Sequence, residues 1–383
     1  MLLTATSRAT WAGILLALLA FQLPAKDLPS PALELLERWR TETGVPGISA
    51  AVSMQGQIVF SGGTGIADLQ TGLAQTGTTV HNIGSISKVL AVVAVLQLVE
   101  QGKVKLDAEI QEYAPWFPRK PQPITVRQLL THTSGIRHYQ DGEFGPTDVM
   151  SFRRYDNFEE STRYWRDDAL LFAPGTHFLY SSYGANLMHA IVESASGKPF
   201  EEYLQERVWG PARMVNTRFD IQARIVARRG RGYVRDEKTG VLENAPDEDV
   251  SYKYAGGGML STDEDLCRFG HALNVGLLLK KETLAEMYKL QLRADIPYFD
   301  PGDQSSPSAG KTQALIFRVG PDSQGRVYAG HSGSVKGTRS QFFNYFKDGI
   351  VVALHFNSDP QPLKTREAAE ALASLYLARA SSK

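Results

Sequence analysis

Ser85 and Lys88 are the residues of this sequence whose types and spacing could do covalent chemistry. They are three positions apart in "SISK", and a helix with that spacing carries both side chains on one face, one turn apart. The apolar segment "VLAVVAVLQLV" follows directly and must be buried on nearly every side. Burial and the positive end of a helix both lower the pKa of a lysine, and a neutral lysine beside a serine hydroxyl is a base beside a nucleophile.

The S-x-x-K pattern is not specific by itself, because about one chance match is expected in a chain of this size. A second match, Ser308 to Lys311, lies in a segment rich in proline, glycine and serine. A purely structural alternative is that Ser85 caps the helix and Lys88 extends its ammonium group to solvent. Spacing alone leaves these two interpretations open, so the choice depends on the rest of the chain.

Two further segments carry residues that suit the same chemistry. Tyr180 lies in "FLYSSYGANL", just before a predicted helix that is capped by Ser181 or Ser182. The residues His331, Ser332 and Gly333 lie in "GHSGSVKG", on a predicted strand that continues through Ser334.

These three elements, in this order, resemble those of the serine β-lactamase and penicillin-binding-protein superfamily. The resemblance is to the branch that includes class C β-lactamases and D-Ala-D-Ala carboxypeptidases. Tyr180-Ser-Ser182 is similar to the Tyr-x-Asn element of that branch, and His331-Ser-Gly333 to a histidine form of its Lys-Thr-Gly element. The stretches "LLTHTSGIRHY" and "AGGGMLSTDEDL" are also similar to that branch. The chain most resembles the mitochondrial-type serine β-lactamase-like proteins and their bacterial relatives, over residues 35–357.

The resemblance implies a role for each of these residues. Ser85 Oγ attacks a carbonyl carbon, and Lys88 and Tyr180 together take up and return the proton. The backbone N–H groups of Ser85 and Ser334 form an oxyanion hole. The oxyanion and substrate-binding set that the resemblance implies is Ser182, His331, Ser332, Gly333 and Ser334, with His331 and Ser332 at the substrate carboxylate. Ser182 and His331 stand where class C β-lactamases have Asn and Lys, which argues against efficient β-lactam hydrolysis without affecting the nucleophile.

The elements that must position these residues predict an α+β protein with a β-lactamase/transpeptidase-like fold. Strand patterns occur at both ends of the chain and helical patterns between them, so we expect one antiparallel sheet with a helical insertion. We expect a single domain over 26–383, with a sheet lobe from 26–84 and 310–383 and a helical lobe from 85–309. Predicted strands include "ALIFRVG", "RVYAGHSGS", "SQFFNYF" and "GIVVALHFN". The segments 139–165 and 296–311 are predicted loops that frame a site.

The composition excludes several classes of partner. The 383 residues carry no formal net charge and are 43% hydrophobic, which gives no indication of nucleic acid or an anionic membrane as a partner. A small molecule or short peptide is the expected substrate, and homo-oligomerisation stays open. No metal or organic cofactor is implied, because H-E-x-x-H is absent and Gly310-Lys311-Thr312 lacks the preceding glycine of a phosphate-binding loop. The single cysteine, Cys267, excludes an intrachain disulfide and is predicted to be a buried thiol.

Residues 1–25 contain an apolar run, "WAGILLALLAFQL", that has the length of a secretory signal peptide. We expect a protein exported to the periplasm or secreted; an uncleaved membrane anchor and a mitochondrial presequence are the alternatives. The predicted function is a serine hydrolase that acts through an acyl-enzyme on small peptides, esters or amides, like a D-Ala-D-Ala carboxypeptidase or an esterase. A class C-like β-lactamase is the first alternative, and a non-catalytic binding or assembly protein with the same fold is the second.

Overall fold

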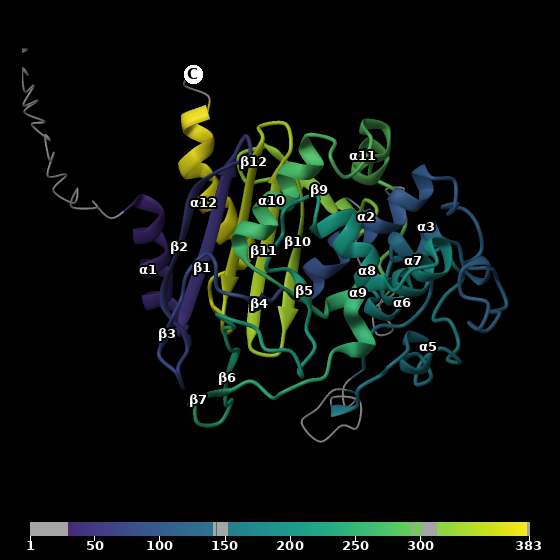
Figure 1. The fold of residues 1–383 in the computed structure, drawn as a ribbon, viewed down its shortest axis with the longest axis horizontal. Coiled ribbons are helices and arrows are strands. Elements are labelled where there is room, and N and C mark those ends of the chain that lie inside the picture. The colour runs from purple at the N-terminus through teal and green to yellow at the C-terminus, as the bar shows by residue number, and fades with distance from the viewer. Residues whose placement is uncertain (1–29, 141–142, 144–151, 293–294, 300–311, 381–383) are drawn as a thin grey trace, which may run out of the picture. The chain divides into compact units, whose positions relative to one another are not determined.

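A seven-stranded antiparallel sheet is built from both ends of the chain in the computed structural model (Figure 1). The structure describes residues 30–140, 143, 152–292, 295–299 and 312–380, and Pro31–Lys383 forms one compact unit. The strand order is β3-β2-β1-β12-β11-β10-β9, so β1 pairs with β12 and joins the two chain ends. The strands are β1 (Gly47–Met54), β2 (Gln57–Asp68), β3 (Leu73–Ala74), β9 (Arg318–Pro321), β10 (Val327–Val335), β11 (Thr338–Tyr345) and β12 (Ile350–Phe356).

Helices cover both faces of this sheet because its central strands are apolar on both sides. The two terminal helices, α1 (Pro31–Thr43) and α12 (Thr365–Ala380), pack on one face with the even-numbered side chains of β1 and β12. The other face packs against α10 (Asp263–Asn274) and the remaining helices (Figure 1). Strands whose side chains are buried on both faces are largely apolar, as is "IVVALHF" of β12, in which only His355 is polar.

The middle of the chain is mostly helical, as predicted. Its central helix, α2 (Ser87–Glu100), is buried from Ser87 to Leu98, in agreement with its lack of a polar face. Short helices and loops surround it: α3 (Val126–Leu130), α5 (Phe158–Ser161), α6 (Ser182–Asn186), α7 (Met188–Ser196), α8 (Phe200–Leu204), α9 (Tyr254–Gly257) and α11 (Lys281–Tyr288). Single turns occur at Gly84–Ile86, Ile110–Glu112, Gln205–Trp209 and Ser251–Lys253.

Two small sheets were not predicted, because strands of two or three residues show no readable alternation. One has the order β4-β8-β5 and the other pairs β6 with β7. Their strands are β4 (His81–Asn82), β5 (Arg218–Phe219), β6 (Tyr233–Arg235), β7 (Leu242–Asn244) and β8 (Met259–Ser261). The strand predicted at 314–320 is also shorter than expected. Residues 314–317 form a buried turn with Ile316 at a φ of 62°, and strand pairing begins only at Arg318.

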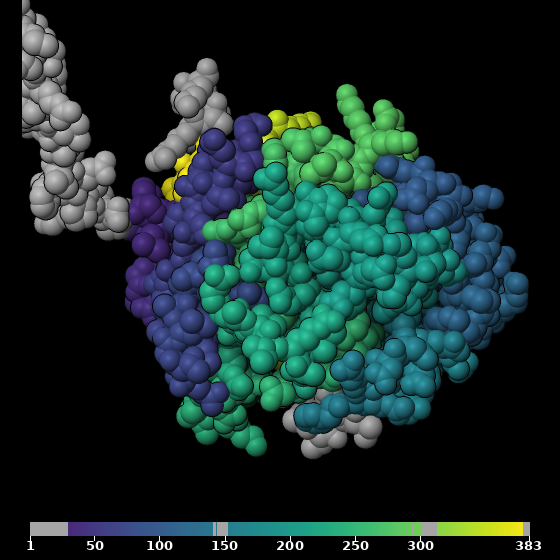
Figure 2. Space-filling model, in the orientation of Figure 1, coloured from purple at the N-terminus to yellow at the C-terminus, as the bar shows by residue number. Residues whose placement is uncertain are grey.

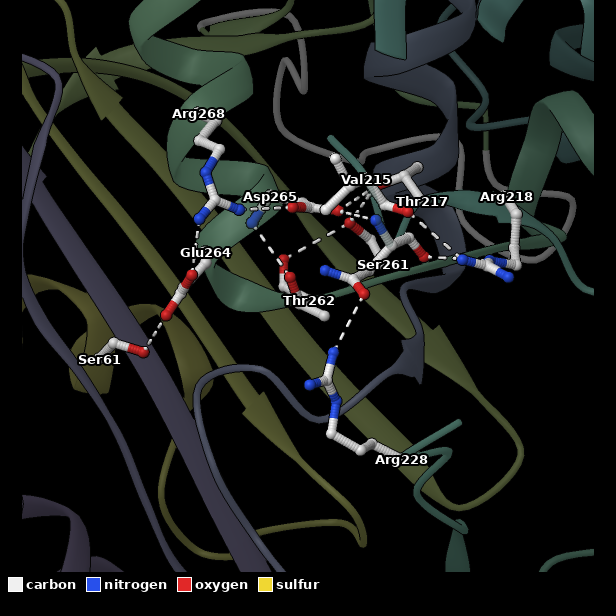
Figure 3. Close-up of polar contacts among 11 residues, drawn as sticks. Ser61, Val215, Thr217, Arg218, Arg228, Ser261, Thr262, Glu264, Asp265 and Arg268 are labelled. Atoms are coloured by element: carbon white, nitrogen blue, oxygen red, sulfur yellow. Dashed lines mark hydrogen bonds and ion pairs between the residues drawn. The ribbon is translucent and has the colours of Figure 1, made fainter. Parts of the chain in front are cut away.

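A buried carboxylate holds the small sheet β4-β8-β5 against α10 (Figure 3). Asp265 accepts hydrogen bonds from the backbone N–H of Asn216 at 2.7 Å and from Thr217 Oγ1 at 3.1 Å, and it pairs with Arg268 at 2.6 Å. The neighbouring Glu264 accepts from Ser61 of β2 at 2.7 Å. In Figure 2 the purple and blue N-terminal strands accordingly lie beside the teal middle of the chain. β4, which pairs with β8 in this small sheet, is followed after one residue by the turn at Gly84–Ile86 that carries Ser85.

The predicted signal segment, residues 1–25, lies outside the described residues. None of the helices in the described part of the chain combines the length and the apolar character needed to cross a bilayer. The predicted domain boundaries remain an expectation, although the sheet strands do come from the two chain ends.

Candidate active site

Ser85 lies in a single 3₁₀ turn, Gly84–Ile86, between β4 and α2. The sequence predicted that Ser85 opens the helix, but α2 begins two residues later, at Ser87. The turn still leads straight into α2, so Lys88 Nζ reaches Ser85 Oγ at 3.0 Å. Ser85 is only partly buried whereas Lys88 is completely buried, which leaves the hydroxyl accessible and the amine shielded from water.

Lys88 has three oxygen atoms around its amino group. Besides Ser85 Oγ, Nζ lies 3.0 Å from Ser182 Oγ and 2.5 Å from the carbonyl oxygen of Gly256. Burial lowers the pKa of Lys88, a negative charge on Tyr180 opposes this, and the nearby cations add to the lowering, so the net shift is downward. A lysine that loses its proton in this position keeps two N–H donors and gains a lone pair that can accept from Ser85.

Tyr180 lies beside this pair, with Lys88 Nζ 5.0 Å from the centroid of its ring. Its hydroxyl is buried and makes no hydrogen bond among the described residues. Burial raises the pKa of Tyr180, but the charge of Lys88 and the polar groups of Lys88 and Ser85 outweigh burial and lower it overall. The structure therefore places a phenol that releases its proton more readily than usual next to an amine that does the same.

His132 accepts hydrogen bonds from the backbone N–H groups of the residues before and after Tyr180. Its carbonyl oxygen accepts from the N–H of Leu179 at 2.9 Å, and its Nδ1 accepts from the N–H of Ser181 at 3.3 Å. Its ring centroid is 4.5 Å from that of Tyr180. His132 is buried and adopts a φ of 57°, a left-handed conformation that is uncommon for residues other than glycine. In the sequence, this histidine belongs to the stretch "LLTHTSGIRHY", and no role was predicted for it.

A second imidazole supports the next residue in the same way. His138 Nδ1 accepts from the N–H of Ser182 at 3.1 Å, and its ring lies 5.5 Å from that of Tyr180. Ser181, rather than Ser182, is the N-cap of α6, because its hydroxyl accepts from the N–H of Gly184 at 2.9 Å. Ser182 Oγ is left to face Lys88, so the serine at the class C asparagine position contacts the lysine.

β10 brings the third predicted element to the site. His331 lies on the side of the strand that faces Tyr180, with the ring centroids 6.0 Å apart. Its Nδ1 lies 2.6 Å from the carbonyl oxygen of Ser332, so Nδ1 carries the proton, and Nε2 has no partner among the described residues. Burial, together with the charges of Arg318 and Lys88, lowers the pKa of His331 to about 3. Ser332 points to the opposite face, opposite Gln341 of β11.

Two glycines let β10 approach the nucleophile turn closely. A Cβ on Gly333 would lie 2.1 Å from the carbonyl oxygen of Ile83, and a Cβ on Gly84 would lie 2.8 Å from the backbone nitrogen of Ser334. Ser340 Oγ adds a hydrogen bond to Ile83 O at 3.2 Å. The backbone N–H of Ser334 is thus held next to the turn that contains Ser85, which is where the resemblance puts an oxyanion hole.

Arg318 is a site residue that sequence reasoning missed. It begins β9, and its guanidinium carbon is 5.9 Å from the centroid of the Tyr180 ring. It makes no ion pair with any described carboxylate. Only the spacing of thirteen residues before His331 separates it from the other arginines of the sequence, and a single sequence gives no reason to select that spacing.

The predicted loops are described only in part. Residues 297–299 run beside Phe178, two residues before Tyr180, with the N–H of Phe178 donating to Pro297 O at 2.9 Å. Residues 141–142, 144–151 and 300–311, including the second S-x-x-K match, lie outside the described residues. Cys267 is buried, with Sγ 3.3 Å from Ala51 O, as predicted for a structural thiol. In the described part of the chain, no group of three or more His, Cys, Asp or Glu residues is placed to hold a metal ion.

Comparisons with known proteins identify the family to which the chain belongs. The Beta-lactamase family profile matches residues 32–376. The chain is 30% identical to the human serine beta-lactamase-like protein LACTB, mitochondrial, over 80% of this chain and 70% of that protein. It is similar in structure to an octameric penicillin-binding protein homologue from Pyrococcus abyssi, with a TM-score of 0.76, 26% identity and coverage of 91% and 77% of the two chains. A D-stereospecific amidohydrolase from Streptomyces sp. aligns with a TM-score of 0.73, 25% identity and coverage of 89% and 97%. The chain therefore belongs to the beta-lactamase family.

Proposed function

We propose that this protein is a serine hydrolase that forms an acyl-enzyme at Ser85 on small peptides, esters or amides. The single observation that carries the proposal is the contact of Lys88 Nζ with Ser85 Oγ at 3.0 Å in a buried setting that lowers the pKa of the lysine. Tyr180 lies next to this pair with its own pKa lowered, so the two groups can share one proton. The similarity to an amidohydrolase supports the same reaction class.

The proposed reaction has two steps, acylation and deacylation. In the first, Ser85 Oγ bonds to the substrate carbonyl carbon, its proton passes to the Lys88–Tyr180 pair and then to the leaving nitrogen or oxygen, and the scissile bond breaks. In the second, water attacks the acyl carbon, gives its proton to the same pair, and Ser85 Oγ leaves and is reprotonated. The N–H groups of Ser85 and Ser334 are proposed to stabilise the oxyanion of both tetrahedral intermediates, at about 2.7–4 kcal/mol for one donor.

The polar groups beyond the nucleophile favour a substrate with a carboxylate on its leaving group. Arg318 is a cation close to Tyr180 with no carboxylate partner among the described residues, and Ser332 is a hydroxyl on the same strand as His331. This arrangement suits a D-alanyl peptide or a related amide better than a neutral ester. Export from the cytoplasm and homo-oligomerisation remain proposals; one relative is named as mitochondrial and one structural neighbour as octameric.

Labelling of Ser85 tests the proposal. A fluorophosphonate or penicillin-type probe is expected to add one adduct mass to the intact protein, and Ser85→Ala is expected to abolish it. Ser194→Ala, which changes an exposed serine of α7, is the matched control and should keep full labelling. Labelling at another residue, or none with any ester, D-peptide or β-lactam, would favour the non-catalytic binding protein.

A β-lactamase is the second candidate because the family profile itself is of that type. Nitrocefin turnover distinguishes it. We expect slow turnover, since Ser182 Oγ faces Lys88 and is too short to replace the asparagine amide of class C enzymes.

A further inference from the structure

A small basic cavity lies at the edge of the sheet, on the face covered by α12. Its volume is about 230 Å³, and three cationic residues line it: Arg318, Lys364 and Arg366. Ser332 and Thr365 add hydroxyl groups. None of the described residues that line it is an aspartate or a glutamate. A lining of one sign in a concave surface concentrates the field and attracts a ligand of opposite charge.

The cavity borders the candidate active site. Arg318 and His331 both line it, and both lie within about 6 Å of the Tyr180 ring, at 5.9 Å and 6.0 Å. β9 pairs with β10 only from Val327 to Gly330. Beyond Gly330, no described strand covers that edge of β10. A substrate held at Ser85 on the His331 side of the sheet can therefore pass around this edge to the cavity on the Ser332 side.

The cations of the cavity are not equivalent. Arg318 has no carboxylate partner among the described residues. Lys364 is largely exposed and lies 3.7 Å from Glu367, a weak contact in water. Arg366 pairs with Glu370 at 2.8 Å and lies over the Tyr328 ring, so its position is fixed by packing. Arg318 can therefore take up one anionic group of a substrate, and Lys364, whose exposed contact with Glu367 is weak, is the lining cation that can exchange its partner for a second one.

We propose that this cavity receives the departing group of the substrate and selects one that carries two anionic groups. The proposal rests on the proposed function and adds a substrate class to it: amides of dicarboxylic amino acids or of phosphorylated amino acids. The group leaves as a neutral amine after it receives the proton of Ser85, and both of its anionic groups are unchanged by the reaction. Arg318 contacts the charge nearer the scissile bond, and Lys364 faces the more distant one.

Four N-acetyl-D-alanyl amides test the proposal, because they share one acyl group and differ only in the departing residue. D-Glutamate is compared with D-glutamine, and O-phospho-D-serine with D-serine. In each pair the charged member is expected to have a kcat/KM about twofold to fivefold higher at low salt. The preference is expected to fall towards one at about 0.5 M NaCl, since an exposed field is screened. The pair with the larger ratio identifies a carboxylate or a phosphate as the second anion.

The variant Lys364→Gln is expected to bring both ratios close to one. Lys103→Gln, which removes an exposed cation beyond the end of α2, is the control and should leave the ratios unchanged. Binding of the same four compounds to Ser85→Ala by calorimetry measures the preference without catalysis. Equal affinities for the two members of each pair overturn the cavity proposal even if Ser85 is labelled. Unequal affinities without any labelling at Ser85 sustain the cavity proposal and refute the hydrolase.

Discussion

His132 offers a sharp test of how the site is held together, since one residue contacts Tyr180 through its ring and anchors the amides on either side of it. His132→Gly keeps the φ of 57° accessible but removes the ring and the Nδ1 acceptor of the Ser181 N–H. The aromatic contact contributes about 0.5–1.5 kcal/mol and the hydrogen bond a similar amount. If this total of about 1–3 kcal/mol is lost from the transition state, acylation slows by about 5- to 150-fold.

His132→Asn separates the two contributions. Asparagine also tolerates a positive φ and has a side-chain oxygen that can accept from the Ser181 N–H, so it loses only the ring. We expect its acylation rate to lie between those of the wild type and His132→Gly. The assay is the pseudo-first-order rate of Ser85 labelling by a fluorophosphonate, measured well below the unfolding midpoint of each variant.

A double-mutant cycle decides whether the effect acts through Tyr180. In a Tyr180→Phe background the proton-transferring hydroxyl is already absent, so His132→Gly is expected to slow labelling little further. Equal slowing in both backgrounds would refute the positioning role, because the loss would then come from general loosening of the fold. An unchanged rate in the wild-type background would refute it as well.

Three further predictions concern the nucleophile, the oxyanion hole and the core. Lys88→Arg should slow Ser85 labelling by about 10²- to 10⁴-fold, because arginine stays charged. In the wild type the labelling rate should rise with pH, with a midpoint below the ordinary lysine pKa of 10.5, because burial lowers the pKa of Lys88. Gly333→Ala should destabilise the protein by about 1–3 kcal/mol and slow acylation, because its Cβ meets Ile83 O. Asp263→Asn should make the unfolding free energy rise more steeply with pH between pH 4.5 and 6.5, by about 1.4 kcal/mol per pH unit, in urea titrations.

The sign of the Asp263 prediction follows from its burial. Burial raises the pKa of Asp263 to about 7, so between pH 4.5 and 6.5 the folded state holds a proton that the unfolded state has released. This group therefore makes stability fall as pH rises, and asparagine removes that opposing slope. Parallel curves of unfolding free energy against pH for the variant and the wild type would contradict the assignment.

For the Gly333 prediction the control is Gly320→Ala, where the nearest atom to a Cβ is a threonine methyl at 3.1 Å. For Lys88, a wild-type labelling rate independent of pH would contradict its role as a base.

Much of the fold could be predicted because it depends on short-range patterns. The two strand-like stretches joined at Gln55-Gly56 indicated β1 and β2, and the unbroken apolar run after Lys88 indicated the buried helix α2. The strand expected at 314–320 was shorter because the chain turns at Ile316 to bury its apolar side chains, which local pattern cannot distinguish from pairing. The small sheet at β4 was missed because its strands are too short to show a period.

The sequence by itself determined that Ser85 and Lys88 meet, because they are three residues apart in a chain that is about to become helical. Family resemblance then indicated Tyr180 and His331 as their neighbours. Only the tertiary structure brought Ser182, 94 residues away, to within 3.0 Å of Lys88 and placed Gly256 O on its other side. It alone also selected His132 and Arg318 from the other histidines and arginines. The physical reason is that contacts within one turn follow from helix geometry, whereas contacts between distant segments depend on how buried faces pack, and a single sequence does not record that packing.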